Sequence, residues 1–226
     1  MTKPQIKMIE LEQTADGSNT LFVPELNEHY HSVKGALTES EHIFIRMGLE
    51  HHPSPSPHIL EIGFGTGLNA FLTLLAAGKS GRTVHYTTLE RYPITPELAN
   101  CLAYPEQISP EHATAFRTLH TAPWEKDVPL TPFFTLHKVQ TDFTTYTFPD
   151  LYDIIYFDAF APEKQPEMWS PKLFTRLFTH LNPGGILTTY CAKGIVRRTL
   201  QAAGFTVERL PGPPEGKREI LRASKI

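Results

Sequence analysis

Residues 59–69 read Ile-Leu-Glu-Ile-Gly-Phe-Gly-Thr-Gly-Leu-Asn, a short apolar run that breaks into three glycines at alternate positions. A strand that ends in glycines and turns directly into a helix brings backbone N–H groups and the positive helix terminus close to a ligand. Gly63, Gly65 and Gly67 therefore predict a site for a nucleotide-type molecule. The competing interpretation is a tight strand-to-helix connection that binds nothing.

The spacing of the glycines indicates which molecule would bind. A dinucleotide fingerprint needs its third glycine one place later, where Leu68 stands, and the motif contains no lysine to hold a phosphate. Glu61 adds a carboxylate, which would repel a phosphate but attract a sulfonium or ammonium group. The motif therefore favours S-adenosylmethionine over NAD or ATP.

The composition is that of an ordinary globular protein: 226 residues, 40% of them apolar and 20% charged. No stretch approaches the length of a membrane span, and the amino-terminal residues lack the apolar core of a signal peptide, so we expect a cytoplasmic protein that binds no membrane. Cys101 and Cys191 are isolated, and the eleven histidines have no Cys or carboxylate partners at ligand spacing. We therefore expect reduced thiols and no metal site.

The net charge is −3, but basic residues gather near the carboxyl terminus. From residue 191 onward there are eight lysines and arginines against three glutamates. A locally basic end on an acidic chain can contact nucleic-acid phosphates. A solvated helix face and a charged edge strand would explain the same pattern, so charge alone leaves both open.

The first 57 residues are predicted to form an amino-terminal extension and linker packed on the main domain, which spans residues 58–226. A capping box, Thr38-x-x-Glu41, predicts the start of a helix in this extension. The Pro/Ser-rich run 51–57 follows, and such a run is stiff and extended, so it marks the boundary.

Beyond this boundary, strand-like and helix-like patterns alternate. The predicted strands are 59–62, 84–89, 134–139, 153–157, 186–190, 205–210 and 218–223, and the helices begin near residues 68, 96, 112, 171 and 194. Alternation predicts right-handed crossovers and a doubly wound α/β fold, while the last two strands are close enough to form an antiparallel hairpin. A mostly parallel, Rossmann-like, seven-stranded sheet with one such hairpin is the architecture of class I methyltransferases.

Ligands of such sheets bind outside the carboxyl ends of the strands. Glu90 ends the second predicted strand, where it would accept hydrogen bonds from ribose hydroxyls. Asp142 and Phe143 follow the third strand and would hold the adenine, and Asp158 follows the fourth, opposite the sulfonium. For each acid alone a helix cap or a solvated loop is the favoured interpretation, but acids at four successive strand ends, counting Glu61, favour the cofactor site.

The segment Asp158-Ala-Phe-Ala-Pro162 is laid out like the Asn/Asp-Pro-Pro-aromatic segment of methyltransferases that act on exocyclic amines. An amine nucleophile must be neutral and aimed, so it needs acceptors for its two hydrogens. Asp158 and the carbonyl of Ala159 are predicted to supply them. Phe160 would stack on a planar base, although simple packing remains the alternative.

Five segments carry a resemblance to a known family. They are Glu61 to Asn69, Leu89 to Pro93, Asp158 to Ser170 and Val196 to Phe205, followed by Gly216 to Leu221. Over nearly its whole length the chain resembles the methyltransferase domain of the bacterial tRNA 5-methylaminomethyl-2-thiouridine biosynthesis enzyme and its free-standing relatives. The segment from Asp158 to Ser170 is long and unusual, which makes the resemblance specific.

The resemblance implies methyl transfer from S-adenosylmethionine to the amine of 5-aminomethyl-(2-thio)uridine at the wobble position of tRNA, with Asp158 as the active-site acid. It also implies that Asn69, at the end of the glycine motif, belongs to the cofactor site. The bifunctional enzyme continues into a flavin-dependent domain that exposes the amine, and we expect no flavin in this chain, which ends at Ile226.

The anticodon stem-loop is the expected partner. The residues predicted to contact its phosphates are Lys193, Arg197, Arg198, Lys217 and Arg218. Two alternatives remain: an aminopropyltransferase of the spermidine synthase type, which has the same fold and an acidic site, and a non-catalytic RNA-binding module. The acids at four strand ends argue against the second alternative, because a dead site does not need them.

Overall fold

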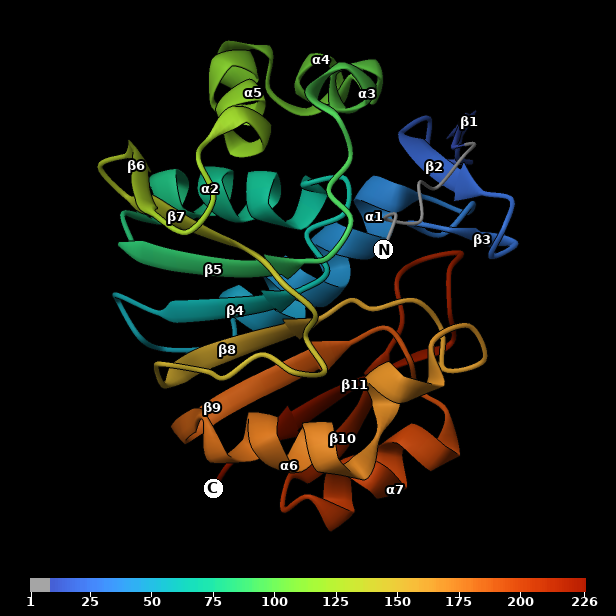
Figure 1. Cartoon of the computed structure of the whole chain (residues 1–226), viewed down its shortest axis with the longest axis vertical. Coiled ribbons are helices and arrows are strands. Elements are labelled where there is room, and N and C mark those ends of the chain that lie inside the picture. Colours follow the sequence, from blue (N-terminus) through green and yellow to red (C-terminus); the bar gives the residue numbers. More distant parts are fainter. Residues whose placement is uncertain (1–8) are drawn as a thin grey trace.

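The computed structural model describes residues 9–226 as a central sheet covered by helices on both faces (Figure 1). One face is covered by α2 (Leu68–Ser80), by α5 (Ala113–Thr121) and by the helical segment that precedes the Pro/Ser run. The other face is covered by α6 (Pro171–Thr179) and α7 (Gly194–Ala202). Each helix layer buries its apolar side chains against the sheet, which gives two apolar cores.

The sheet has eight strands in the order β10-β11-β9-β8-β4-β5-β7-β6. Their bounds are β4 His58–Ile62, β5 Val84–Glu90, β6 Asp127–Thr131, β7 Phe134–Gln140, β8 Tyr152–Phe157, β9 Leu181–Thr189, β10 Thr206–Pro211 and β11 Glu219–Ser224. The five inner strands from β7 to β9 run parallel, and β11 pairs antiparallel with both β9 and β10. The predicted class I fold and its carboxyl-terminal hairpin are thereby confirmed.

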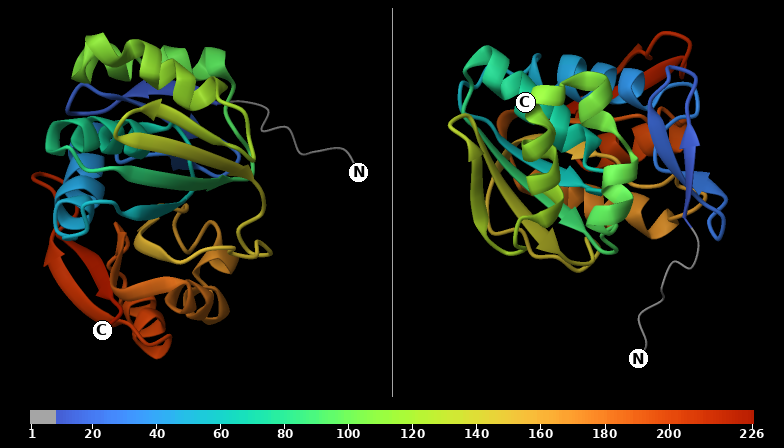
Figure 2. Two further views of the ribbon diagram at one scale, coloured as in Figure 1. Left: turned by 90° about the vertical axis from the view of Figure 1, so that its left-hand side faces the viewer. Right: turned by 90° about the horizontal axis from the view of Figure 1, so that it is seen from above.

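The predicted number of seven strands is wrong, because β6 adds an antiparallel strand beside β7. Its sequence, Asp127-Val-Pro-Leu-Thr131, carries a proline where a central strand would need a backbone N–H donor. An edge strand tolerates that proline, so a segment that resembled a loop in sequence still joins the sheet. The strand lies at the edge opposite the hairpin, as Figure 2 also shows.

The front segment forms a separate three-stranded antiparallel sheet and then a helix. The strands are β1 (Glu10–Gln13), β2 (Asn19–Val23) and β3 (Glu28–His29); α1 (Ala36–Ser40) continues directly into the π-helical η1 (Glu41–Leu49). Phe44 of η1 packs on Tyr156 of β8 with ring centroids 5.1 Å apart. This contact anchors the front segment on the central sheet, while the division at residue 57 stays a prediction.

The predicted capping box is wrong. The helix begins two residues before Thr38, and Thr38 donates both its backbone N–H and its hydroxyl to Asp16, over 2.9 and 2.8 Å. Asp16 lies in the turn between β1 and β2, so the cap comes from a different element. Sequence spacing cannot reveal a cap that another part of the chain supplies.

Shorter helices complete the fold. They are α3 (Pro96–Cys101), α4 (Tyr104–Ile108) and two 3-10 turns, η2 (Pro110–His112) and η3 (Pro166–Trp169). The η3 turn precedes α6, which has Ser170 at its N-cap and Pro171 at its first helical position, so it begins where the sequence predicts a helix. No helix within residues 9–226 is both long and apolar enough to cross a membrane.

Candidate active site

The glycine turn after β4 is built from backbone conformations that favour glycine. The φ angles of Gly63, Gly65 and Gly67 are 93°, 52° and 74°, all in the left-handed region. A Cβ atom on Gly65 would lie 2.9 Å from the Tyr30 ring, and one on Gly67 would lie 2.8 Å from Nε2 of His120. The turn is therefore packed too closely for side chains at these positions, and it brings backbone N–H groups to the start of α2.

A cavity of about 280 Å³ opens beside this turn. Its lining includes the predicted cofactor residues Gly63, Gly65, Asn69, Glu90, Asp142, Phe143 and Asp158. Five acidic residues line it against a single arginine, Arg91, which is itself paired with Asp142 over 2.7 Å. Such a negative site suits a cationic ligand and disfavours a polyphosphate.

Two acids are held firmly at the cavity wall. Glu90 accepts hydrogen bonds from the backbone N–H groups of Gly65 and Tyr92, at 3.0 and 2.7 Å. Asp142 accepts from the backbone N–H and hydroxyl of Thr144, at 2.9 and 2.6 Å. Burial alone would raise the pKa of Asp142, but these hydrogen bonds and the Arg91 charge hold that pKa below its usual value. The Asp142 carboxyl group is thus ionised, and the hydrogen bonds fix both side chains in place.

Glu61 does not lie where the sequence predicted. Its side chain is 0% exposed and is absent from the cavity wall; one carboxylate oxygen accepts a hydrogen bond of 2.6 Å from the Thr88 hydroxyl. Burial raises the pKa of Glu61 to about 8. The side chains of a strand alternate between its two faces, and Glu61 faces the core under α2. It cannot contact a cofactor directly.

Asp158 stands immediately after β8 and is half-buried. The amide nitrogen of Asn69 donates to its Oδ2 over 2.8 Å, and Gly63 packs against its backbone carbonyl. Burial raises the pKa of Asp158 to about 7, even though the Asn69 hydrogen bond acts to lower it. Near neutral pH this carboxyl group can therefore either accept or hold a proton.

A second cavity, of about 640 Å³, adjoins the first. The two share the wall residues Tyr30, His31, Asp158, Ala159 and Phe160. Its other walls come from the front segment, from residues 190–193 after β9 and from the loop that enters β11. The Asp158 carboxyl group thus lies at the junction of a cofactor-sized site and a second, larger site.

The turn from Asp158 to Phe160 is fixed from behind by two aromatic donors. The Tyr190 hydroxyl donates to the carbonyl of Ala159, and Nε1 of Trp169 donates to the carbonyl of Phe160, each over 2.8 Å. Ala159 was predicted to receive a substrate hydrogen; its carbonyl accepts this one hydrogen bond from Tyr190, so one of its two lone pairs is in use. The Phe160 ring meets the Tyr30 ring edge-on, with centroids 5.2 Å apart, at the boundary of the two cavities. Trp169 itself is buried.

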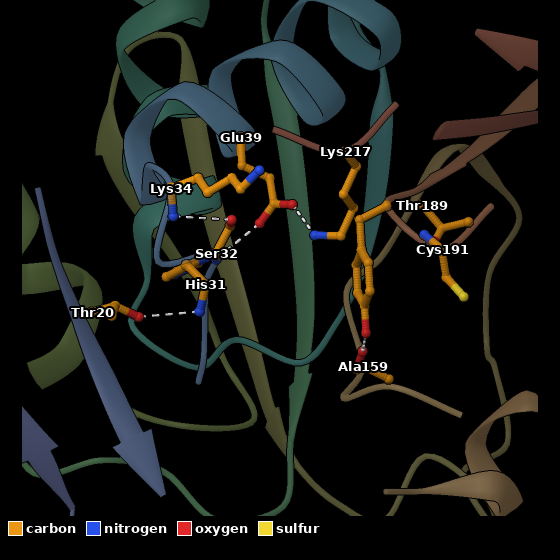
Figure 3. A network of polar contacts seen from close by, with 10 residues as sticks. Thr20, His31, Ser32, Lys34, Glu39, Ala159, Thr189, Cys191 and Lys217 are labelled. Atoms are coloured by element: carbon orange, nitrogen blue, oxygen red, sulfur yellow. Dashed lines mark hydrogen bonds and ion pairs between the residues drawn. The ribbon is translucent and has the colours of Figure 1, made fainter. Parts of the chain in front are cut away.

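The five basic residues predicted to bind tRNA divide into two groups. Lys193, Lys217 and Arg218 line the second cavity, whereas Arg197 and Arg198 lie on α7 outside its wall. Lys193 forms an ion pair with Glu163, and Lys217 forms one with Glu39 (Figure 3). The charges of Lys193 and Lys217 are therefore already paired with carboxylates. The side chains of Arg198 and Arg218 are exposed to solvent.

The residues of the second cavity that sequence reasoning missed include Tyr30, His31, Glu39 and Tyr190. The first three come from the front segment, which the sequence treated as an extension without a role in the site. Tyr190 directly follows β9, so the rule that found the other strand-end residues would have found it as well. Among residues 9–226, no group of three His, Cys, Asp or Glu side chains is placed to hold a metal ion.

The fold and the acidic cavity at its glycine turn define an S-adenosylmethionine-dependent methyltransferase of class I. In agreement, residues 130–226 match a family model described as S-adenosyl-L-methionine-dependent methyltransferase. The chain is 32% identical, over 94% of its length, to the tRNA 5-methylaminomethyl-2-thiouridine biosynthesis bifunctional protein MnmC of Cupriavidus metallidurans, which confirms the predicted resemblance. It spans about a third of the length of that relative.

Two solved structures share the fold. The crystal structure of MNMC2 from Aquifex aeolicus matches 98% of this chain and 72% of its own, with a TM-score of 0.74 and 24% identity. Spermidine synthase from Thermotoga maritima matches 100% of this chain and 82% of its own, with a TM-score of 0.58 and 16% identity. At these identities the likeness establishes the fold alone.

Proposed function

We propose that this protein transfers a methyl group from S-adenosylmethionine to the amine of 5-aminomethyl-(2-thio)uridine at position 34 of tRNA, giving 5-methylaminomethyl-(2-thio)uridine. The observation that carries the proposal is the position of Asp158, whose carboxyl group lies where the cofactor cavity meets the second cavity. The similarity to the bifunctional tRNA-modification protein supplies the substrate.

The first cavity fits the cofactor. Glu90 has carboxylate lone pairs left for the ribose hydroxyls, since its two backbone hydrogen bonds use only part of its acceptor capacity. Asp142 and the backbone of Phe143 are available for the adenine edge. The negative charge of Glu90, Asp142 and Asp158 complements a sulfonium cation.

S-adenosylmethionine supplies a methyl group to the lone pair of the neutral amine, the carbon–sulfur electrons stay on sulfur, and the products are S-adenosylhomocysteine and a methylated ammonium. The protein must therefore first neutralise an amine whose pKa, like that of a lysine, is near ~10.4. Asp158 attracts the ammonium form, accepts its proton and keeps the nitrogen in place. A carboxyl pKa of about 7 suits this exchange near neutral pH.

The second cavity suits a nucleoside on a charged backbone. Phe160 and Tyr30 offer aromatic rings for a planar base beside Asp158. Arg218 at its rim, and Arg197 and Arg198 on α7, are available for anticodon phosphates. With tRNA as its substrate, the protein would act in the cytoplasm.

The test is incubation with methyl-labelled cofactor and tRNA that carries 5-aminomethyluridine, followed by mass spectrometry of the nucleosides. We expect one methyl group on the side-chain nitrogen of that uridine, and a rate of its formation at least about 10²-fold lower with the Asp158→Asn variant. A parallel reaction with decarboxylated S-adenosylmethionine and putrescine tests the aminopropyltransferase alternative. Spermidine formation without tRNA methylation would overturn the proposal, and tRNA binding without either product would favour the non-catalytic module.

A further inference from the structure

Tyr190 places a hydroxyl group in the second cavity, close to the reacting end of the site. It follows the last residue of β9, is half-buried and lines the cavity together with Asp158 and Ala159. Its hydroxyl donates to the carbonyl of Ala159 over 2.8 Å. A phenol has a single proton, so this hydrogen bond fixes the proton and leaves the lone pairs of the oxygen free to accept.

The hydroxyl stays protonated in this position. Burial, followed by the nearby Asp158 carboxylate, raises the pKa of Tyr190. Tyr190 therefore cannot act as a base, but it remains a neutral acceptor in the same cavity wall as Asp158. The carbonyl of Ala159, by contrast, already uses one of its two lone pairs to accept the Tyr190 proton.

We infer that the hydroxyl oxygen of Tyr190 is the second acceptor for the substrate amine, so that Asp158 and Tyr190 together hold its two hydrogens and aim its lone pair at the methyl group. This inference rests on the proposed amine methylation. It moves the second acceptor from the backbone of Ala159 to a side chain on the next strand. Two acceptors on separate strands orient a nitrogen more firmly than one carboxylate can.

The ring of Tyr190 is also in contact with the side chain of Lys217. The Lys217 ammonium lies 4.6 Å from the ring centroid, in the range of a cation–π contact. Glu39 binds Lys217 with one carboxylate oxygen and accepts the backbone N–H of Ser32 with the other, over 3.0 Å; Figure 3 shows these contacts. The front segment and the loop before β11 thereby fix the acceptor, which is what positioning a reacting nitrogen requires.

The test compares two RNA stem-loops in the presence of S-adenosylhomocysteine. One carries 5-aminomethyluridine at the wobble position, and the other carries 5-methyluridine, which has no donor there. Tyr190→Phe removes only the hydroxyl. It should weaken binding of the aminomethyl RNA by about 10- to 100-fold, the scale of a hydrogen bond to a charged group, and leave binding of the 5-methyluridine RNA unchanged.

Tyr152→Phe is the matched control, because Tyr152 is buried on the neighbouring strand β8 and its hydroxyl has no hydrogen-bond partner within residues 9–226. It should bind both RNAs like the wild type. If Tyr190→Phe weakens both RNAs equally, or weakens neither, Tyr190 only supports the turn and the inference fails. Failure of the wild type to methylate the aminomethyl RNA would instead overturn the proposed function, and the inference with it.

Discussion

The side-chain amide of Asn69 donates a hydrogen bond to Oδ2 of Asp158 over 2.8 Å, joining the first turn of α2 to the end of β8. The last residue of the glycine motif thus holds the carboxyl group that we assign to the substrate. Because the bond stabilises the charged form, it opposes the effect of burial on the pKa of Asp158. The cofactor site and the acid–base group are therefore coupled through one side chain.

Asn69→Ala should shift the pH dependence of the reaction. Without this donor the pKa of Asp158 rises further, so a higher pH is needed to ionise it. We expect the acidic limb of kcat against pH, measured at saturating cofactor, to move upward, with activity lost at pH 7 and partly regained near pH 9. Asn182→Ala is the control, since Asn182 makes the same kind of bond, also 2.8 Å long, to Asp153 near the start of β8. An unmoved limb in Asn69→Ala would remove this bond from the mechanism.

Asp158→Asn keeps the shape of the side chain but removes its charge and its basicity. Turnover should fall by roughly 10²- to 10⁴-fold, the range expected for lost acid–base assistance, while cofactor affinity stays nearly unchanged. Single-turnover rates from pH 6 to 9 at saturating cofactor and tRNA measure this. A variant that stays within a few-fold of the wild-type rate throughout would show that Asp158 is not the acid–base group.

Glu90→Ala tests the cofactor cavity. The variant loses charge-assisted hydrogen bonds to the ribose as well as the bond that holds Gly65, so binding of S-adenosylhomocysteine should weaken by on the order of 1.5–3 kcal/mol. Calorimetry without added metal measures the change. Glu106→Ala, on an exposed residue of α4, should bind like the wild type. Equal affinities in the two variants would place the ribose elsewhere.

Glu61→Gln tests the buried acid. The pKa of Glu61 is about 8 in the folded protein, above its ordinary value of 4.5, so the folded state binds a proton that the unfolded state releases. Its contribution to stability is therefore full below pH 4.5 and is lost as the pH rises to 8. Glutamine does not titrate, so the Tm of the variant should rise relative to that of wild type between pH 5 and 8. A constant difference in Tm would contradict the raised pKa.

Arg197 and Arg198 test the RNA surface on α7. Replacing both with alanine should weaken tRNA binding and flatten its dependence on salt by roughly one log–log unit for each phosphate that is no longer neutralised. Cofactor affinity should not change, because α7 lies outside the cofactor cavity. Arg117→Ala on α5, which removes one positive charge from an exposed residue elsewhere, serves as a control. A salt slope equal to that of wild type would exclude both arginines from the interface.

The sequence by itself determined the fold class and identified strand-end residues that line one cavity. Alternating periodicities identified the parallel strands, and the carboxyl ends of parallel strands share one edge, so Glu90, Asp142 and Asp158 had to lie near one another. The glycine turn followed from its spacing alone. These inferences depend on local sequence patterns and on the right-handed crossover that nearly all parallel strand–helix–strand units adopt.

Only the tertiary structure decided the rest. Glu61 lies one residue before the end of β4, and the alternation of side chains along the strand turned it into the core. Tyr190 forms a hydrogen bond with Ala159, which is 31 residues away in the sequence, and Lys217 forms one with Glu39, which is 178 residues away. No local pattern encodes such pairs, because their partners are chosen by how whole elements pack. The cofactor site could be predicted from one edge of one sheet, whereas the second cavity exists only where the front segment and the last hairpin close over that edge.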